Sequence, residues 1–347
     1  MEDNRGKKII LAHGSGGSLT RRLIEEVFAG AFANELLAPL NDQAVFAMPK
    51  SQVAFTTDSY VINPIFFPGG DIGKLSVCGT VNDLAVGGAK PLYMSAGFII
   101  EEGLDIDDLK KVVESMAKEA RAQGVSIVTG DTKVVERGKG DKLFINTAGI
   151  GVVQDGLSLS PTLIRPGDAV IVSGTIGDHG IAVMTKRAGI EMEVPVESDC
   201  ASLWALVSDM LGAGGCIKAM RDATRGGVAT VLNEFAISSG TTIVIDENLL
   251  PVKDAVTGAC ELLGFDPLSL ANEGKLVAVV SGESAGRVLA AMKKNPLGVD
   301  AAIIGVVEGA ASGADGAGAK GRLLMETRIG NRRIIDMPSG EQLPRIC

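Results

Sequence analysis

The apolar positions near the start of the chain predict a strand, a loop and a helix in succession. Residues 7–12 have the composition of a short strand, and the glycine-rich run 13–17 follows. Ser18 can cap a helix whose apolar face carries Leu19, Leu23, Ile24, Val27 and Phe28. A glycine loop between a strand and a helix can bind phosphate, although Leu19 occupies the place of the third glycine in the dinucleotide pattern. The loop therefore predicts either a phosphate site or a plain mobile turn.

Strands and helices are predicted to alternate up to residue 153. Branched and aromatic residues predict strands at 53–62, 125–129 and 144–153. Asp71 and Asp105 can each cap a helix with an apolar stripe, and Gly87 and Gly124 can end these helices. The strand 125–129 would present the run 130–133, Gly-Asp-Thr-Lys, at its carboxyl end, where ligand sites are common.

A second unit of alternating strands and helices begins after the turn at 165–168, Arg-Pro-Gly-Asp. It opens with a buried-looking strand at 169–173 and continues through residue 305. Residues 310–321 are nearly all Gly, Ala and Ser, which predicts a flexible loop. We therefore expect a mixed α/β fold with domains at 1–155 and 156–335 and a flexible tail at 336–347.

Composition and charge narrow the classes of function. The chain has 347 residues, which is typical of about two domains, and its formal charge is -9. Such an acidic chain is poorly suited to binding nucleic acid or an anionic membrane face. Charges or Gly/Pro clusters interrupt each apolar stretch before the ~18 residues that a membrane span needs. The polar N-terminus also lacks the layout of a secretory signal. We therefore expect a cytoplasmic protein without nucleic-acid or membrane partners.

The spacing of the cysteines and histidines indicates that any bound metal would have carboxylate ligands. The five cysteines are widely spaced without a C-x-x-C pair, and the two histidines lie far apart, so a zinc site does not fit. Asp42, Asp58, Asp83 and Asp131 lie in or beside apolar, glycine-rich segments. Gathering them in one cleft would raise their pKa values unless a cation neutralised them, and Mg²⁺ with polyphosphate suits such ligands. The alternative is four separate caps and turns.

The sequence lacks the familiar nucleotide loops. The Gly-Lys pairs at 73–74 and 274–275 lack the first glycine of a P-loop, and leucine follows each of them. The run 221–228, Arg-Asp-Ala-Thr-Arg-Gly-Gly-Val, precedes a helical pattern and can present backbone N–H groups to an anion. A capped helix start explains this run equally well.

The chain ends on a thiol. From Asp336 to Cys347 the extended reach is about 35–40 Å at ~3.3 Å per residue, enough to bring the thiol into the chain's own cleft or to another protein. Nothing follows Cys347, which excludes a prenylation box. The tail can therefore serve as a carrier arm, and the alternative is an incidental exposed cysteine. Arg345 can partly offset the terminal carboxylate, whose charge opposes thiolate formation.

Eight short segments, taken together, are characteristic of one family. They are residues 13–17, 57–58, 81–85, 130–133, 174–180, 221–227, 272–274 and 344–347. With them, nearly the whole chain resembles the carbamoyl dehydratases of hydrogenase maturation, the HypE family. This family belongs to the superfamily of aminoimidazole ribonucleotide synthetase, selenophosphate synthase and thiamine-monophosphate kinase. The run Gly-Asp-His-Gly at 177–180 and the ending Pro-Arg-Ile-Cys point to the dehydratase branch.

The resemblance implies a two-domain aminoimidazole ribonucleotide synthetase-like fold that binds Mg-ATP in a cleft. It also implies a homodimer formed through a β-barrel shared by the N-terminal domains. By resemblance, the expected magnesium and nucleotide ligands are Asp42, Asp58, Asp83, Asp131 and Asp222. Further nucleotide contacts are expected from Asn82, Gly130 and Gly226. Asp42 departs from the family pattern, because Asn41-Asp42-Gln43-Ala44 lacks paired acids.

The resemblance further implies a reaction on Cys347. A carbamoyltransferase, HypF, would load a carbamoyl group onto the thiol, and ATP-dependent dehydration would convert the thiocarboxamide into a thiocyanate. The cyano group would then pass to iron on the scaffold proteins HypC and HypD, as the cyanide ligand of [NiFe] hydrogenase. Lys133 is our candidate for neutralising phosphate charge and Glu273 for removing the amide proton. The alternatives are a surface lysine and a turn glutamate.

Three competing functions remain at this stage. Selenophosphate synthase is expected to have a reactive Cys or selenocysteine and a Lys in its N-terminal glycine loop, and the loop here has no cysteine. A small-molecule kinase explains the carboxylates but not the terminal thiol. A non-catalytic, nucleotide-bound scaffold would use the tail only for docking. ATP consumption that depends on carbamoylated Cys347 separates enzyme from scaffold.

Overall fold

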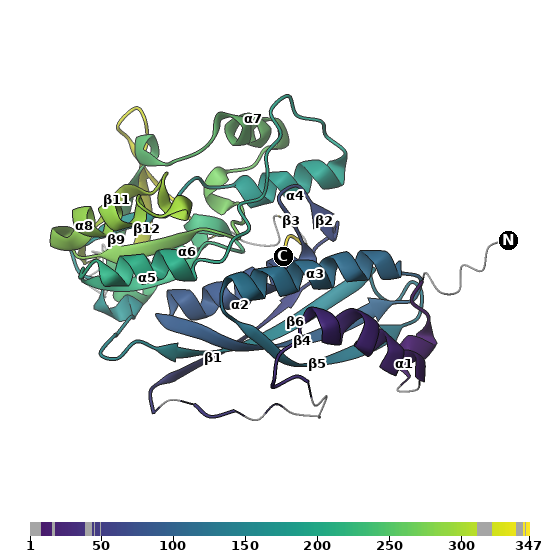
Figure 1. Cartoon of the computed structure of the whole chain (residues 1–347). Coiled ribbons are helices and arrows are strands. Elements are labelled where there is room, and N and C mark those ends of the chain that lie inside the picture. The colour runs from purple at the N-terminus through teal and green to yellow at the C-terminus, as the bar shows by residue number, and fades with distance from the viewer. Residues whose placement is uncertain are drawn as a thin grey trace.

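Two units, each built on a β-sheet, make up the described part of the chain (Figure 1). The computed structural model describes residues 8–15, 18–38, 44, 46–48, 50–310, 321–337, 343 and 345–347. Asp42, a predicted magnesium ligand, lies outside the described residues, as does most of the predicted loop 310–321. Within the described residues, no helix is long and apolar enough to cross a membrane.

The first unit contains a four-stranded sheet in the order β1-β6-β4-β5. Its strands are β1 (Val53–Tyr60), β4 (Ala89–Glu101), β5 (Ser126–Val135) and β6 (Leu143–Val153), and a small hairpin is formed by β2 (Phe66–Phe67) and β3 (Gly70–Asp71). Helices α2 (Ile72–Val86) and α3 (Ile106–Ala122) cover one face of the sheet (Figure 1). On the other face, Val53, Phe55 and Ile99 remain exposed.

Helix α2 begins where the sequence predicts it. The Asp71 carboxylate accepts hydrogen bonds from the backbone N–H groups of Gly73 (2.7 Å) and Lys74 (3.2 Å). Almost every residue of α2 is buried, because the helix packs on the first sheet and also contacts β8 and α5 of the second unit. The helix therefore joins the two units and carries Asn82 and Asp83 to their boundary.

Three local predictions differ from the structure. The strand predicted at 7–12 is wrong: Lys8 forms an isolated bridge to Asp105, and η2 (Leu11–Gly14) follows, with the Ile10 N–H donating to His13 Nδ1 at 3.0 Å. Asp105 precedes α3, but its side chain pairs with Lys8 at 2.9 Å instead of capping the helix. The run 130–133 lies within β5, not beyond it, because β5 pairs with β4 as far as Val135.

The predicted N-terminal helix is confirmed as α1 (Ser18–Leu23), continued by the π-helix η3 (Ile24–Ala29). Leu23, Val27 and Phe28 of its predicted apolar face are buried, and the Phe28 ring packs against Phe98 of β4 with centroids 4.8 Å apart. Helical spacing of apolar residues was therefore a reliable signal here.

The second unit contains a seven-stranded sheet in the order β13-β12-β9-β11-β7-β10-β8. Its strands are β7 (Ala169–Val172), β8 (Ile217–Asp222), β9 (Thr241–Asp246), β10 (Leu276–Val280), β11 (Ala302–Ala310), β12 (Arg322–Glu326) and β13 (Arg332–Ile334). Its helices are α4 (Asp178–Ala188), α5 (Trp204–Gly212), α6 (Gly227–Ser239), α7 (Asp254–Leu263) and α8 (Gly282–Met292), with short 3-10 turns η4 (Pro161–Leu163), η5 (Glu247–Leu249), η6 (Pro267–Ser269) and η7 (Pro296–Gly298).

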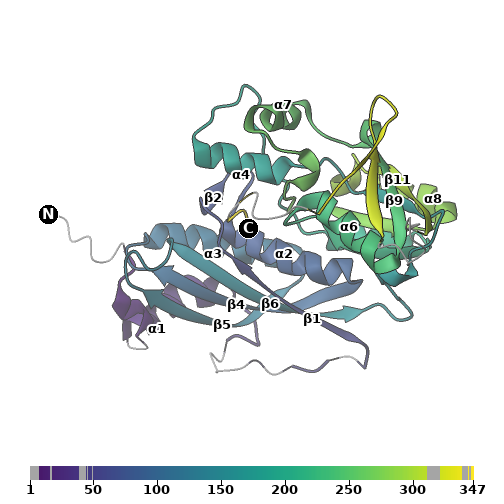
Figure 2. The ribbon, with the colours of Figure 1, turned by 180° about the vertical axis from the view of Figure 1, so that it is seen from behind.

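Helices cover both faces of this second sheet. Val170 and Val172 of β7 belong to the core cluster that includes α6, whereas Ile171 between them belongs to the cluster of α5 and α8. Figure 2 shows α6 in front of the sheet and α8 behind it. The C-terminus of the chain lies between the two units, near α3 and α4, in both views (Figures 1 and 2).

Candidate active site

Three of the predicted carboxylates face one another at the boundary between the units. Asp58 lies on β1, Asp83 on α2 and Asp222 at the end of β8. Burial, together with the charges of Asp83 and Asp58, raises the pKa of Asp222 to about 7. Burial also raises the pKa of Asp83, and the charge of Asp58 adds to this effect. The three groups therefore form an anionic cluster that destabilises its own ionised state.

Hydroxyl groups of β1 hold two of these carboxylates in place. Thr56 Oγ1 donates to Asp83 Oδ2 at 2.6 Å, and the Tyr60 hydroxyl donates to Asp58 Oδ2 at 3.2 Å. Residues 56, 58 and 60 share one face of the strand, which is the face toward α2. Burial nevertheless dominates and raises the pKa of Asp58, although the Tyr60 hydrogen bond and the Arg225 charge oppose the shift.

The donor set fits magnesium better than a metal held by protein alone. In the described residues, no group of three or more His, Cys, Asp or Glu side chains is placed to ligate a metal directly. Mg²⁺ usually keeps several waters and binds through one or two carboxylates together with substrate phosphates. Asp58, Asp83 and Asp222 offer hard oxygen atoms whose mutual repulsion a cation would relieve. The residues present therefore fit Mg²⁺ carried in with a polyphosphate.

Glu273 lies buried beside this cluster. Glu273 is only 2 % exposed, and its Oε1 has no hydrogen-bond partner in the described part of the chain. Burial raises its pKa well above the ordinary value, and the charges of Asp222, Asp199 and Asp58 act in the same direction. A buried carboxyl group with one free oxygen and a raised pKa is suited to exchanging a proton with a bound substrate.

Asn82 and Asp199 hold the segment that carries Glu273. Asn82 Nδ2 donates to the backbone oxygen atoms of Ala201 (3.1 Å) and Glu273 (3.2 Å), and its Oδ1 accepts from the Leu203 N–H at 2.7 Å. The Asp199 carboxylate accepts from the Glu273 N–H at 3.0 Å. The structure thus gives Asn82 a role in joining α2 to the second unit, while its nucleotide contact stays a prediction.

Gly226 and Gly130 occupy positions that exclude a side chain. Gly226 precedes α6 with φ at +75°, and a Cβ atom there would lie 2.1 Å from Thr230 Oγ1. Gly226 is the N-cap residue of α6, and within the described residues no side chain caps this helix. A Cβ atom on Gly130 would lie 2.5 Å from the Ala96 carbonyl oxygen of β4. Both glycines therefore satisfy a backbone requirement, and their nucleotide contacts stay predictions.

Asp131 and Lys133 do not lie on the sheet face that carries Asp58. Both are exposed on the edge strand β5, where Lys133 Nζ pairs with Asp131 Oδ1 at 2.9 Å and lowers the pKa of that carboxyl. The register Ser59–Asn146–Gly97–Asp131 places Asp131 on the same sheet face as Ser59, which is opposite to the face of Asp58. Both residues line a cavity of about 530 Å³ whose lining does not include Glu273.

The last three residues pair with the chain just beyond β1. The Val61 N–H donates to the Cys347 carbonyl oxygen at 3.1 Å, and the Asn63 N–H donates to that of Arg345 at 3.3 Å. Arg345 Nε donates to the Val61 carbonyl oxygen at 2.9 Å, and its Nη1 binds Asp141. The described end of the tail is thus docked against its own chain.

Ile346 is buried and Cys347 is half-buried, which adds to this docking. Ile346 is 3 % exposed within the core of the first unit, and burying such a side chain contributes about 1.5–3 kcal/mol. Burial raises the pKa of the Cys347 thiol to about 12, and the charges of Glu273, Asp58 and Asp222 raise it while Arg225 lowers it. The thiol therefore lies among the carboxylates of the cleft, close to the predicted base.

Comparisons with known proteins show the family to which the chain belongs. Residues 40–153 match the N-terminal domain family, and residues 165–315 the C-terminal domain family, of AIR synthase related proteins. A carbamoyl dehydratase HypE of Rhizobium leguminosarum bv. viciae is 53% identical over 98% of this chain and 95% of that protein. The chain belongs to the carbamoyl dehydratase HypE family.

Solved structures of HypE proteins share the fold. A crystal structure of the hydrogenase maturation protein HypE in complex with ATP is 48% identical, with a TM-score of 0.92 over 97% of this chain and 99% of that one. A chain of a HypE–HypF complex is 50% identical, with a TM-score of 0.78 over 91% of this chain and 99% of that chain. These matches confirm the predicted two-domain, mixed α/β fold of the aminoimidazole ribonucleotide synthetase type.

Sequence reasoning missed several residues that contact or influence the candidate site. Arg225 and His179 lie within runs that were recognised but assigned no individual role. Tyr60 and Asp199 carried no sequence signal, because a tyrosine in a strand and an aspartate in a polar loop are ordinary. Their contacts to Asp58 and to the Glu273 backbone arise only when distant segments meet.

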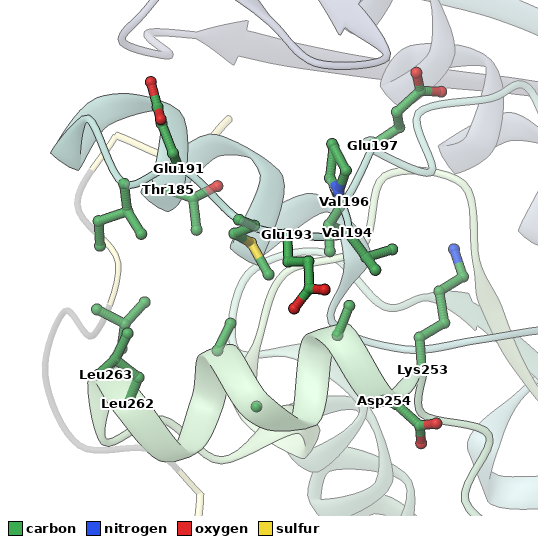
Figure 3. A pocket seen from close by; sticks show the side chains of 16 residues that line it. Thr185, Glu191, Glu193, Val194, Val196, Glu197, Lys253, Asp254, Leu262 and Leu263 are labelled. Atoms are coloured by element: carbon green, nitrogen blue, oxygen red, sulfur yellow. The ribbon is translucent and has the colours of Figure 1, made fainter.

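A separate cavity of about 710 Å³ lies between the end of α4, residues 190–197 and α7 (Figure 3). Glu191, Glu193 and Glu197 carry acid groups around it, and Val194 and Leu262 are exposed hydrophobic residues of its lining. Its lining contains none of the predicted site residues. The volume of this cavity therefore does not identify it as the candidate active site.

Proposed function

We propose that this enzyme dehydrates a carbamoyl group carried on Cys347, converting the thiocarboxamide into a thiocyanate at the expense of ATP. The product supplies the cyanide ligand of the iron centre during [NiFe] hydrogenase maturation in the cytoplasm. One observation carries the proposal: the chain end is hydrogen-bonded to Val61 and Asn63, just beyond the strand that carries Asp58. Burial raises the pKa of the Cys347 thiol there, and the charges of Glu273, Asp58 and Asp222 act on it in the same direction. Membership of the HypE family supports the same reaction.

The chemistry assigns a proton-transfer role to Glu273. An amide oxygen leaves poorly, so transfer of the γ-phosphoryl group to this oxygen makes it a phosphate leaving group. Loss of phosphate and of both N–H protons then leaves the nitrile carbon bonded to sulfur. Glu273 removes amide protons, because its Oε1 has no partner among the described residues and because burial and neighbouring charges raise its pKa, which makes its carboxylate a stronger base.

The anionic cluster is the proposed site for magnesium. Asp58, Asp83 and Asp222 would hold Mg²⁺, with Asp42 and Asp131 as further proposed ligands. When bound, Mg²⁺ neutralises the phosphate charges and so favours phosphoryl transfer. The carboxylates of the chain orient the ion, and the low exposure of Glu273 and Ile346 helps to exclude water from the adduct.

We also propose a homodimer through the open face of the first sheet. Val53 is 49% exposed and Phe55 is 70% exposed on this face, and association of two such sheets into a barrel would cover them. Asp131 and Lys133 lie on the same face. In such a dimer they are available to the cleft of the other copy, which would reconcile their predicted roles with their distance from Glu273.

The proposed partners act at the thiol. HypF would load the carbamoyl group, and the solved HypE–HypF complex of a relative supports this pairing. The thiolate is the nucleophilic form of cysteine, and the docked Cys347 has a pKa of about 12. Loading therefore takes place with the tail out of the cleft. HypC and HypD are the proposed acceptors of the cyano group.

Intact-mass analysis tests the function. The protein is incubated with carbamoyl phosphate and the transferase, with and without ATP. We expect a carbamoyl adduct on Cys347 that loses the mass of one water only when ATP is added to the dehydratase. The variant Cys347→Ser is the control and should acquire no adduct. Water loss without ATP, or an adduct on another residue, would contradict the proposal.

A further inference from the structure

His179 contacts the docked tail from the second unit. It is the second residue of α4, and it is fully buried. Its Nε2 lies 2.8 Å from the Ile346 carbonyl oxygen, and its Nδ1 lies 2.8 Å from Ser198 Oγ. The ring also packs edge-on against Phe67, with centroids 5.4 Å apart. The proposed chemistry assigns no task to this histidine.

The two contacts determine which ring nitrogen carries the proton. A carbonyl oxygen only accepts hydrogen bonds, so Nε2 must be the donor to Ile346. Burial lowers the pKa of His179 and so favours the neutral ring. Ser198 Oγ already accepts from the Cys200 N–H at 3.1 Å, which leaves its own hydrogen to donate to His179 Nδ1. Ser198 is itself held by its backbone N–H, which donates to the Pro68 carbonyl oxygen at 2.9 Å. The donor therefore has one orientation, directed at the tail.

The His179 hydrogen bond binds a carbonyl group of the tail, that of Ile346, which Val61 and Asn63 of the first unit do not bind. The carbonyl groups of Arg345 and Cys347 accept from the Asn63 and Val61 N–H groups of the first unit, and that of Arg345 also accepts from Arg187 Nη2 of α4 at 2.7 Å. Within the described residues, the hydrogen bond of the Ile346 carbonyl is to His179 alone. Without that donor, a carbonyl of a residue 3 % exposed would lack a partner.

We propose that His179 is a positioning residue for the reaction, which acts by binding the Ile346 carbonyl and holding Cys347 in the cleft. The first unit binds the tail through Val61 and Asn63. Helix α4 binds it through Arg187 at the Arg345 carbonyl and through His179 at the Ile346 carbonyl, which is the contact nearer to Cys347 in the chain. The chemical consequence rests on the proposed function, because correct placement of a carbamoylated Cys347 matters only if that adduct reacts in the cleft. The docking itself is independent of the reaction.

Alkylation of the unloaded protein tests the docking directly. Iodoacetamide is added at pH 8, and peptide mass spectrometry follows the rate at each cysteine. His179→Phe removes the donor but keeps an aromatic ring, and we expect Cys347 to react about tenfold faster, as a buried carbonyl that loses its partner predicts. His179→Gln restores a donor and should return the rate toward that of the native protein.

The other cysteines provide internal controls. Cys216 is exposed and should react at the same rate in every variant, whereas Cys78 and Cys260 are buried and should stay protected while the fold is intact. An unchanged Cys347 rate in His179→Phe with Cys78 and Cys260 protected would overturn the proposal. If that variant unfolds, Ser198→Ala decides: faster labelling of Cys347 alone supports the proposal, and an unchanged rate overturns it.

The labelling and dehydration assays together distinguish a failure of the His179 proposal from a failure of the proposed function. Labelling requires neither ATP nor the transferase, so a native protein that fails to form thiocyanate leaves the docking result standing. Conversely, if the native protein is active, carbamoylated His179→Phe should form thiocyanate more slowly than His179→Gln at saturating ATP. Equal rates in the two variants would show that docking through His179 has no part in the reaction.

Discussion

The two groups of predicted site residues in the first unit face opposite sides of one sheet. Asp58 and Asp83 lie between the sheet and the second unit, with Asp222 and Glu273 beside them, and burial raises their pKa values. Asp131 lies on the exposed face of β5, where Lys133 lowers its pKa. Within one chain, Asp58, Asp83 and Asp222 repel one another. Asp131, in contrast, is neutralised by its ion pair with Lys133.

The difference shows what each group can do in isolation. Crowded, half-buried carboxylates gain stability when a cation arrives, so the cleft is prepared for a metal and its phosphates. An exposed ion pair is screened by water and contributes little to folding. Asp131 and Lys133 are therefore expected to matter for ligand binding or assembly, and not for the stability of the chain.

Glu273→Gln should have the largest effect on the cleft. The amide keeps the shape of the side chain but cannot accept the substrate proton, so thiocyanate formation should fall by about 10²-fold or more. ATP affinity, measured by calorimetry, should stay unchanged because the charge cluster remains. Unchanged turnover of carbamoylated protein in the intact-mass assay would remove Glu273 from the mechanism.

Asp222→Asn should separate ligand binding from stability. Loss of a ligand should weaken Mg-ATP binding by about tenfold or more. The same change removes a repelling charge, so the unliganded protein should melt at a higher temperature at pH 8. Asp131→Asn is the matched control, and it should not raise the melting temperature, because that carboxylate is already paired. A lower melting temperature for Asp222→Asn would argue against repulsion in the cluster.

Stability of the unliganded protein should depend on pH through Asp222. The unfolded carboxyl releases its proton near pH 4, whereas the folded one holds it until about pH 7. Between these values the folded state binds more protons, so the free energy of unfolding falls as pH rises. Urea unfolding between pH 4 and pH 8 measures this slope. Asp222→Asn should flatten it, and an equal slope in both proteins would assign the dependence to other groups.

Lys133→Gln should have the smallest effect on folding. Its ion pair with Asp131 is exposed on both sides, so the free energy of unfolding should change by less than about 0.5 kcal/mol. Thiocyanate formation should nevertheless fall if Lys133 serves the cleft of a second copy. Mixing Lys133→Gln with Glu273→Gln would then restore activity, because a mixed dimer contains one intact site. No restoration in verified mixed dimers would contradict a shared site.

Local signals predicted the elements that depend on neighbouring residues. The Asp71 cap and α2, the apolar face of α1 and the strand β6 were found because each rests on contacts within a few residues or on a regular spacing. The strand at 7–12 failed because Lys8 meets only the single partner Asp105. The length of β5 was underestimated because β4, distant in sequence, supports its far end. The domain boundaries at 155 and 335 stay predictions.

The sequence alone determined which residues were candidates for chemistry: acidic groups in apolar surroundings, Glu273 and a terminal thiol are unusual in composition and position, and their resemblance to one family is visible without coordinates. Only the tertiary structure decided which of them meet. Register placed Asp58 and Asp131 on opposite sheet faces, and docking of the chain end placed Cys347 beside Glu273 with His179 behind it. The physical reason is that a side chain's direction and charge environment depend on strands and helices far away in sequence, whose packing no local pattern records.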